Sequence, residues 1–167
     1  LGCSTNPTFY IRRFSTANGV TTIRNPVVRT TFAGLAGASG NVDETTVNDS
    51  TYLLQKIAGA GLLPAGASCA GDPFNCVSDR CDLAGSGNCV GSQTAFSDRS
   101  VSASRIDFVP YSDCPAPFSA WKCLAANSTY QLTVQDGSGG ILNINGIPLT
   151  CGGAYPCTAT FSTNDII

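Results

Sequence analysis

Nine cysteines among 167 residues, with no histidine, constrain this chain more than any other feature of its sequence. Clustered cysteines form disulfides or bind zinc, and their spacing distinguishes the two. No two of them stand in a CxxC pair, which together with the missing histidine argues against a zinc site. The sequence therefore predicts disulfide-stapled loops in a secreted, extracellular or cell-surface protein. The candidate disulfide cysteines are Cys69, Cys76, Cys81, Cys89, Cys114, Cys123, Cys151 and Cys157.

The pairing of these cysteines does not follow from the sequence, because eight cysteines allow many connectivities. Proximity favours two short loops, Cys114–Cys123 around PAPFSAWK and Cys151–Cys157 around GGAYP. The other four cysteines lie in a stretch with little hydrophobic periodicity, residues 64–100, which we expect to form a long disulfide-held loop layer.

The fold class follows from short alternating segments. Only 12% of the residues are charged, and Glu44 is the single glutamate, a composition typical of strands joined by turns. Tyr130, Leu132 and Val134 alternate with polar residues, as in a half-buried strand. The sequence predicts an all-β, antiparallel β-sandwich or jelly-roll-like domain. Its later strands are expected at Ser104–Val109, Ser128–Gln135, Ile141–Leu149 and Thr158–Ser162.

One short helix is expected at about residues 50–59, in the segment NDSTYLLQKIAGAG. Asn48, Asp49 or Ser50 can cap it, and Gly59 can end it. Its apolar face would pack on a sheet and consists of Leu53, Leu54, Ile57 and Ala58.

The amino-terminal region is predicted to be extended. Residues 1–35 are interpreted as an arm of edge strands, and residues 36–167 as a single disulfide-rich β-domain. The turn signal Asn18-Gly19 is expected to fold residues 9–16 against residues 20–24 as a hairpin.

Charge is unevenly distributed along the chain. Residues 1–42 contain four arginines and no acidic residue, whereas residues 43–167 contain five basic and eleven acidic residues. A basic arm can pack on its own acidic body, or on the next copy in a head-to-tail filament. We predict the second, a secreted subunit of a pilus-like or wall-associated fibre whose partners are other copies of the chain. Its assembly residues would be Cys3, Phe9, Ile11, Arg12, Arg13, Arg24 and Arg29.

Cys3 stands apart from the other cysteines. Leu1-Gly2-Cys3-Ser4 resembles the end of a bacterial lipobox, in which the cysteine becomes the lipidated first residue. Lipobox cleavage would remove Leu1 and Gly2, and their presence argues against lipidation of Cys3. A free exposed thiol is unfavourable in a secreted protein, which leaves a disulfide. Cys3 is expected to bridge either to its own body or to a neighbouring copy.

The loop CPAPFSAWKC contains the single tryptophan of the chain. Trp121 and Phe118, with Tyr155 from the other short cysteine loop, can form a glycan-stacking platform on a carbohydrate-binding module. A lone tryptophan is also often a core residue, and the sequence leaves both alternatives open.

Catalysis finds little support in the sequence. Without histidine, a Ser-His-Asp triad is excluded, and the remaining enzyme hypothesis is a small hydrolase that uses two carboxylates. Most aspartates stand in turn contexts, where their side chains bond the backbone. A calcium site is a further alternative, because oxygen ligands of the kind that calcium prefers lie close together at Asp72, Asp79, Asp82 and Asn88. Turn formation is the better explanation for these residues too. We therefore predict no enzyme, no metal and no cofactor. The net charge of −2 argues against nucleic acid, and no apolar run is long enough to span a membrane.

The sequence contains two N-glycosylation sequons. Asn48-Asp49-Ser50 and Asn127-Ser128-Thr129 both match the motif, whereas Asn6-Pro7-Thr8 is blocked by its proline. Asn48 is also a candidate helix cap. Asn127 precedes a predicted strand and is the better acceptor.

Overall fold

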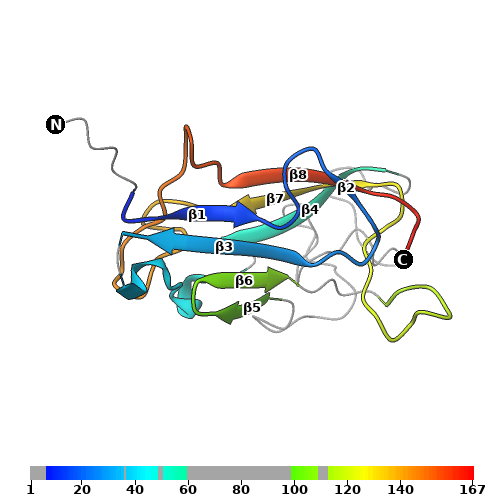
Figure 1. Ribbon diagram of the computed structural model, residues 1–167, viewed down its shortest axis with the longest axis horizontal. Coiled ribbons are helices and arrows are strands. Elements are labelled where there is room, and N and C mark those ends of the chain that lie inside the picture. The colour runs from blue at the N-terminus through cyan, green and yellow to red at the C-terminus, as the bar shows by residue number, and fades with distance from the viewer. Residues whose placement is uncertain (1–6, 36, 49–50, 60–98, 109–112) are drawn as a thin grey trace.

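Two four-stranded sheets pack face to face in the computed structural model, which describes residues 7–35, 37–48, 51–59, 99–108 and 113–167 (Figure 1). The first sheet has the order β1 (Phe9–Phe14), β3 (Val28–Gly34), β6 (Arg105–Phe108) and β5 (Arg99–Ser102). The second has the order β2 (Thr21–Thr22), β8 (Thr158–Thr163), β7 (Thr129–Val134) and β4 (Tyr52–Ala58). The predicted all-β sandwich is confirmed. Neighbouring strands are antiparallel except for β2 and β8, which are parallel.

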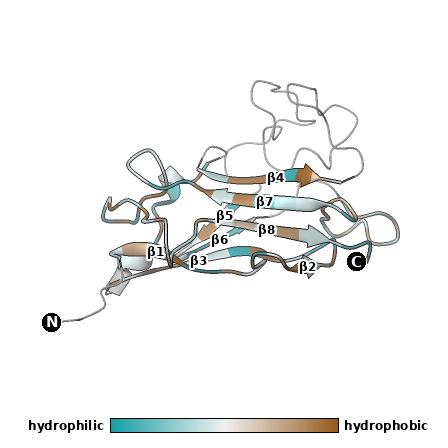
Figure 2. Ribbon diagram, turned by 90° about the horizontal axis from the view of Figure 1, so that it is seen from above, coloured by the Kyte–Doolittle hydropathy of each residue, from teal (hydrophilic) through white to brown (hydrophobic). Residues whose placement is uncertain are grey.

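Alternation of apolar and polar residues explains how the two sheets make a core. Strand β7 buries every second side chain, and β3 and β8 do the same along most of their length. Figure 2 shows hydrophobic and hydrophilic residues along the strands of both sheets. Inward-facing residues of one sheet thus meet those of the other, as in other aligned sandwiches. The core includes Phe9, Val28, Phe32, Ile106 and Phe108 from the first sheet and Tyr52, Leu54, Tyr130, Leu132 and Phe161 from the second.

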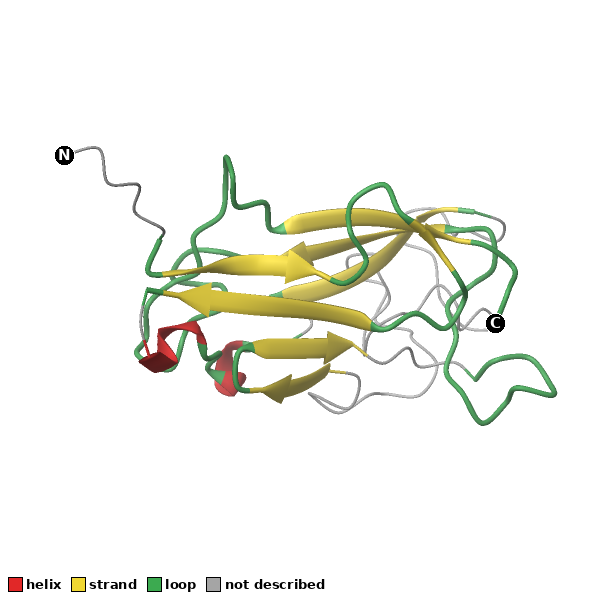
Figure 3. Cartoon of the chain, in the orientation of Figure 1, coloured by secondary structure: helices red, strands yellow, loops and turns green. Residues whose placement is uncertain are grey.

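The predicted helix at about residues 50–59 is wrong, because this segment forms β4. It pairs with β7 along its whole length, from Tyr52 opposite Val134 to Ala58 opposite Thr129. The inward positions are Tyr52, Leu54 and Lys56, and the lysine side chain is only 3% exposed. Because Lys56 is charged and occupies an inward position, apolar and polar residues do not alternate regularly along this segment of the sequence. Within the described residues, helical turns are confined to η1 (Gly37–Gly40) and η2 (Glu44–Thr46), shown in red in Figure 3.

The predicted amino-terminal hairpin is also wrong. The turn at Asn18-Gly19 exists, since the amide of Val20 donates to the carbonyl of Ala17. Beyond that turn the chain crosses to the second sheet, where β2 joins β8. Strand β1 instead pairs with β3, with Phe9 opposite Gly34.

The segment 141–149 forms a small hairpin of its own and not a strand of the sheet. Leu142 bridges to Pro148, and the side chain of Asn143 accepts hydrogen bonds from the amides of Asn145 and Ile147 at 3.0 and 2.8 Å. Its other backbone partner also lies outside the two sheets, because Val42 forms a β-bridge with Asn143 and the amide of Ile144 donates to the carbonyl of Asn41 at 3.0 Å.

Both predicted short disulfides are confirmed, Cys114–Cys123 and Cys151–Cys157. They indicate an oxidising environment, as the cysteine content does. Cys3, Cys69, Cys76, Cys81 and Cys89 lie outside the described residues, as do the candidate oxygen ligands Asp72, Asp79, Asp82 and Asn88. No helix in the described part of the chain is long and apolar enough to cross a membrane.

Candidate functional site

A disulfide-closed loop places two aromatic side chains on the surface. Asp113 and Lys122 form a β-bridge at its base, and the amide of Cys114 donates to the carbonyl of Trp121 at 2.7 Å. Lys122 Nζ also lies 2.6 Å from Asp113 Oδ1. The Cys114–Cys123 bond therefore reinforces a loop that backbone hydrogen bonds already shape.

Trp121 and Phe118 are stacked at the surface. Their ring centroids are 5.6 Å apart and their planes are inclined by 14°. Trp121 is 52% exposed and Phe118 is 40% exposed, so that the tryptophan does not fill the core beneath the loop. Large exposed aromatic groups on a rigid loop are typical of binding surfaces.

Trp121 forms one wall of a pocket of about 490 Å³, a volume in the range of small-ligand sites. The segment leading into β3 also lines the pocket, and its Val27 is 63% exposed. Phe118 does not line the pocket but stacks on the Trp121 ring. The lining residues are Asn25, Pro26, Val27, Val28, Arg29, Asp107, Phe108, Ala120, Trp121 and Lys122.

An ion pair between adjacent strands contributes two of the polar side chains that line this pocket. Arg29 on β3 lies directly opposite Asp107 on β6. The guanidinium donates two hydrogen bonds to the carboxylate, at 2.6 and 3.0 Å, and both side chains keep about a third of their surface exposed (35% and 27%). The hydrogen bond and charge of Asp107 raise the pKa of Arg29 above its ordinary value. Such a bidentate pair presents fixed donors and acceptors to a ligand.

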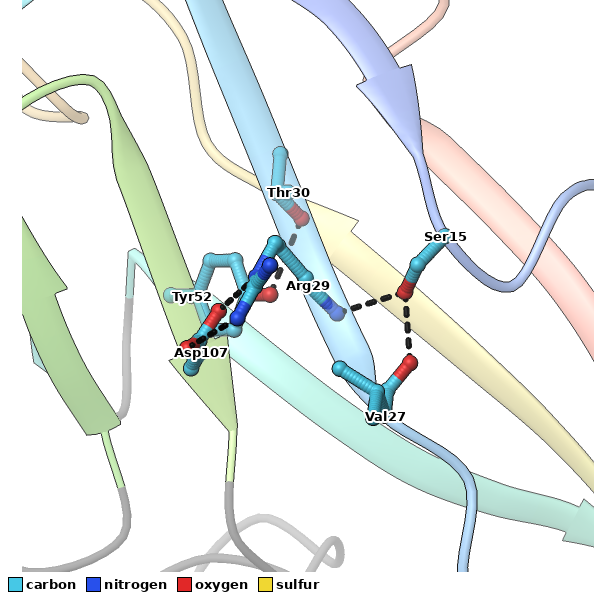
Figure 4. A network of polar contacts seen from close by, with 6 residues as sticks. All are labelled: Ser15, Val27, Arg29, Thr30, Tyr52 and Asp107. Carbon is cyan, nitrogen blue, oxygen red and sulfur yellow. Dashed lines mark hydrogen bonds and ion pairs between the residues drawn. The ribbon is translucent and has the colours of Figure 1, made fainter.

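Ser15 holds the pocket-lining segment in place from the neighbouring strand region (Figure 4). Its hydroxyl donates to the carbonyl of Val27 at 2.6 Å and accepts from the amide of Arg29 at 2.7 Å. One residue further along β3, the Thr30 hydroxyl is hydrogen-bonded to the Tyr52 hydroxyl at 2.9 Å across the two sheets. The wall of the pocket is thereby tied both to the end of β1 and to the core.

Burial raises the pKa of Tyr52 far above its ordinary value of 10.0, and the nearby carboxylate of Asp107 adds to the shift. In the unfolded chain the phenol loses its proton above about pH 10, whereas the folded protein retains it. The contribution of Tyr52 to stability is therefore complete below about pH 10 and decreases as the pH rises further.

We expect the Tyr52→Phe variant to respond less to alkaline pH. At neutral pH the variant should lose about 1 kcal/mol of unfolding free energy with the hydrogen bond to Thr30. Above about pH 10 the stability of the wild type should fall more steeply, by up to about 1.4 kcal/mol per pH unit for this one group. Urea denaturation between neutral and alkaline pH measures both slopes, and equal slopes would contradict the assignment.

The structure separates Tyr155 from the other two aromatic residues of the predicted platform. Its ring packs edge-on against Tyr10 at 4.9 Å. Tyr10 pairs with Ala33 near the end of β3, whereas the pocket lies at the start of that strand. Phe118 and Trp121 are therefore brought together, and Tyr155 is not.

The residues predicted for assembly are dispersed. Phe9 and Ile11 are buried in the core. Arg12 and Arg13 are exposed on β1 at a register shift. The other two basic residues contact the body of the same chain, Arg24 through the Leu124 carbonyl at 3.0 Å and Arg29 through Asp107.

Comparison with models of protein families, with curated proteins and with solved structures finds no match. The function must therefore be inferred from the chemistry of the site.

Proposed function

We propose that this protein is a secreted carbohydrate-binding module whose site is the Trp121 pocket. The observation that carries the proposal is the exposed tryptophan, stacked on Phe118 in a loop closed by a disulfide. The oxidising environment indicated by the disulfides agrees with a secreted protein that meets extracellular glycans.

A sugar ring matches both surfaces of this pocket. One face of a pyranose is made of C–H groups, and its rim carries hydroxyls that donate and accept hydrogen bonds. The indole of Trp121 supplies a flat apolar surface for the first, and Arg29 with Asp107 supplies donors and acceptors for the second. Val27 adds a second apolar surface to the lining of the pocket.

The charges of the pocket favour a neutral sugar over an acidic one. Each cation that lines it is paired with a carboxylate of the same chain, Arg29 with Asp107 and Lys122 with Asp113. An anionic ligand would compete with these carboxylates, whereas a hydroxyl can hydrogen-bond to the pairs as they stand.

We propose binding and not hydrolysis at this site. A glycosidase places two carboxyl groups on either side of the scissile bond. Among the described residues that line the pocket, Asp107 is the only carboxylate, and Arg29 engages both of its oxygens.

Removal of the indole tests the proposal. We expect Trp121→Ala to weaken binding to a neutral polysaccharide about 30-fold, the effect of losing an interface anchor worth about 2 kcal/mol. Affinity electrophoresis against a panel of neutral and uronic-acid polysaccharides measures this change.

Ile144→Ala is the matched control, since Ile144 is also 52% exposed but does not line the pocket. It should bind as the wild type does. Wild-type protein that retains no polysaccharide, or a Trp121→Ala variant that binds normally, would reject the proposal.

A filament subunit is a second candidate, favoured by the position of β1 at the edge of its sheet with Arg12 and Arg13 exposed. Part of that edge is used within the chain, because the amide of Thr150 donates to the carbonyl of Phe9 at 3.0 Å. The register shift between Ile11 and Arg13 further limits pairing with another strand.

Assembly is tested by the mass of the protein in solution. For a filament we expect large species that an Arg12→Glu/Arg13→Glu variant converts to monomers, since the charge reversal would oppose an acidic neighbour. Light scattering over a range of protein concentrations measures the mass. Wild-type protein that stays monomeric throughout would argue against this candidate.

A further inference from the structure

The turn that precedes β7 contains a sequon whose asparagine faces solvent. Asn127 is exposed and has a φ of 50°, in the left-handed region that asparagine adopts more readily than most residues. The two residues after it belong to the fold: Ser128 is buried, and Thr129 begins β7.

Hydrogen bonds fix the backbone of this turn without using the Asn127 side chain. The amide of Asn127 donates to the carbonyl of Asn164 at 3.2 Å, and that of Ser128 donates to the Thr163 hydroxyl at 3.1 Å. The Asn127 carboxamide makes no hydrogen bond to any residue in the described ranges. A substituent on its nitrogen would therefore displace no contact of the described fold.

The other sequon has a different environment. Asn48 is half-buried, and its side-chain oxygen accepts a hydrogen bond from the amide of Thr51 at 3.1 Å. The hydroxyl of Thr51 closes the same turn, donating to the carbonyl of Thr46 at 2.6 Å and accepting from the amide of Asn48 at 3.0 Å. A bulky group on the Asn48 carboxamide would have to be accommodated beside this turn.

We propose that Asn127 is an N-glycan attachment site and that Asn48 is not. The donor class is a polyprenyl-pyrophosphate-linked oligosaccharide, present in secretory pathways that carry an oligosaccharyltransferase. The Asn127 Nδ2 forms a bond to the anomeric carbon while the bond from that carbon to the pyrophosphate oxygen breaks. The polyprenyl pyrophosphate leaves with the electron pair and takes up the proton lost from Nδ2, and nothing is oxidised or reduced.

Secretion of the full chain from cultured eukaryotic cells tests this assignment. We expect one N-glycan per chain, and treatment with peptide N-glycosidase should convert Asn127 to aspartate while Asn48 stays asparagine. Peptide mass spectrometry reads both positions in the same sample. The enzymatically deglycosylated protein should unfold at the same urea concentration as the glycosylated form, as expected for a change at an exposed site.

Two variants make the result specific. Asn127→Gln should be secreted without N-glycan, and Asn48→Gln should keep the wild-type glycan. A chain with no glycan at Asn127, or with a glycan at Asn48, would overturn the proposal. Loss of secretion in Asn127→Gln leaves the wild-type peptide map as the deciding measurement.

Discussion

Replacing Phe9 with alanine is expected to lower the free energy of unfolding by about 3–5 kcal/mol, the usual effect of removing a buried phenylalanine ring. Phe9 is 0% exposed and stacks on Phe32, with ring centroids 5.4 Å apart. The cavity would lie between the two sheets, where neighbouring side chains cannot move in without disturbing the strands. Chemical denaturation of the Phe9→Ala variant measures the loss.

Arg12→Ala is the control for Phe9→Ala, because Arg12 is exposed on the same strand. Its stability should stay within about 0.5 kcal/mol of the wild type. The effect of Phe9→Ala should also be independent of protein concentration, since Phe32 belongs to the same chain. A loss that appears only at concentrations where copies associate would indicate that β1 packs on a neighbouring subunit instead.

The strands that the sequence predicts correctly are those with an unbroken two-residue period. Tyr130, Leu132 and Val134 are all buried, as their alternation with polar residues predicts. Strand β6 likewise lies within its predicted segment, and β8 covers the whole of its predicted segment and extends one residue beyond it, to Thr163. Each of these strands has its apolar residues on one face and fits a half-buried position in a sandwich.

Strand β4 shows why the same method fails elsewhere. Its outward Leu53 and Ile57 are apolar, and its inward Lys56 is charged, so that the apolar residues mimic the spacing of a helix. The pairing with β7 outweighs that local pattern. A helix and a strand can be distinguished for this segment only when its neighbouring strand, β7, is known, and the sequence alone does not identify that neighbour.

The turn at Asn18-Gly19 illustrates a related limit. The sequence correctly predicts that the chain bends there, but the bend is stabilised by the second sheet. The amide of Gly19 donates to the carbonyl of Thr160 at 2.7 Å, and the amide of Thr160 donates to the Asn18 side chain at 3.0 Å. A turn motif predicts a reversal of direction and not the sheet that the chain enters next.

Half of the candidate site could be predicted and half could not. The cysteine loop with Phe118 and Trp121 is visible in the sequence because its residues are adjacent. The ion pair that lines the same pocket is not, since Arg29 and Asp107 are 78 positions apart and meet only through the pairing of β3 with β6. The prediction that Arg29 takes part in assembly rested on its positive charge alone, because the sequence does not show that Asp107 lies beside it.

The second large effect concerns the loop that carries Trp121. Removing the Cys114–Cys123 bond in a Cys114→Ser/Cys123→Ser variant should lower the free energy of unfolding by about 2–3 kcal/mol, the loop-closure entropy expected for so short a loop. It should also weaken polysaccharide binding at least about tenfold, because the ligand would have to order the loosened loop and its tryptophan.

The other disulfide separates these two effects. Cys151–Cys157 closes a loop of similar length, with a sequence separation of 6 against 9, but lines no part of the Trp121 pocket. A Cys151→Ser/Cys157→Ser variant should therefore lose a similar amount of stability, about 2–3 kcal/mol, and keep its affinity for polysaccharide. Denaturation and affinity electrophoresis on both variants make the comparison. If both lose affinity equally, general destabilisation explains the loss; if only the Cys114→Ser/Cys123→Ser variant does, the rigidity of the Trp121 loop is itself part of the binding site.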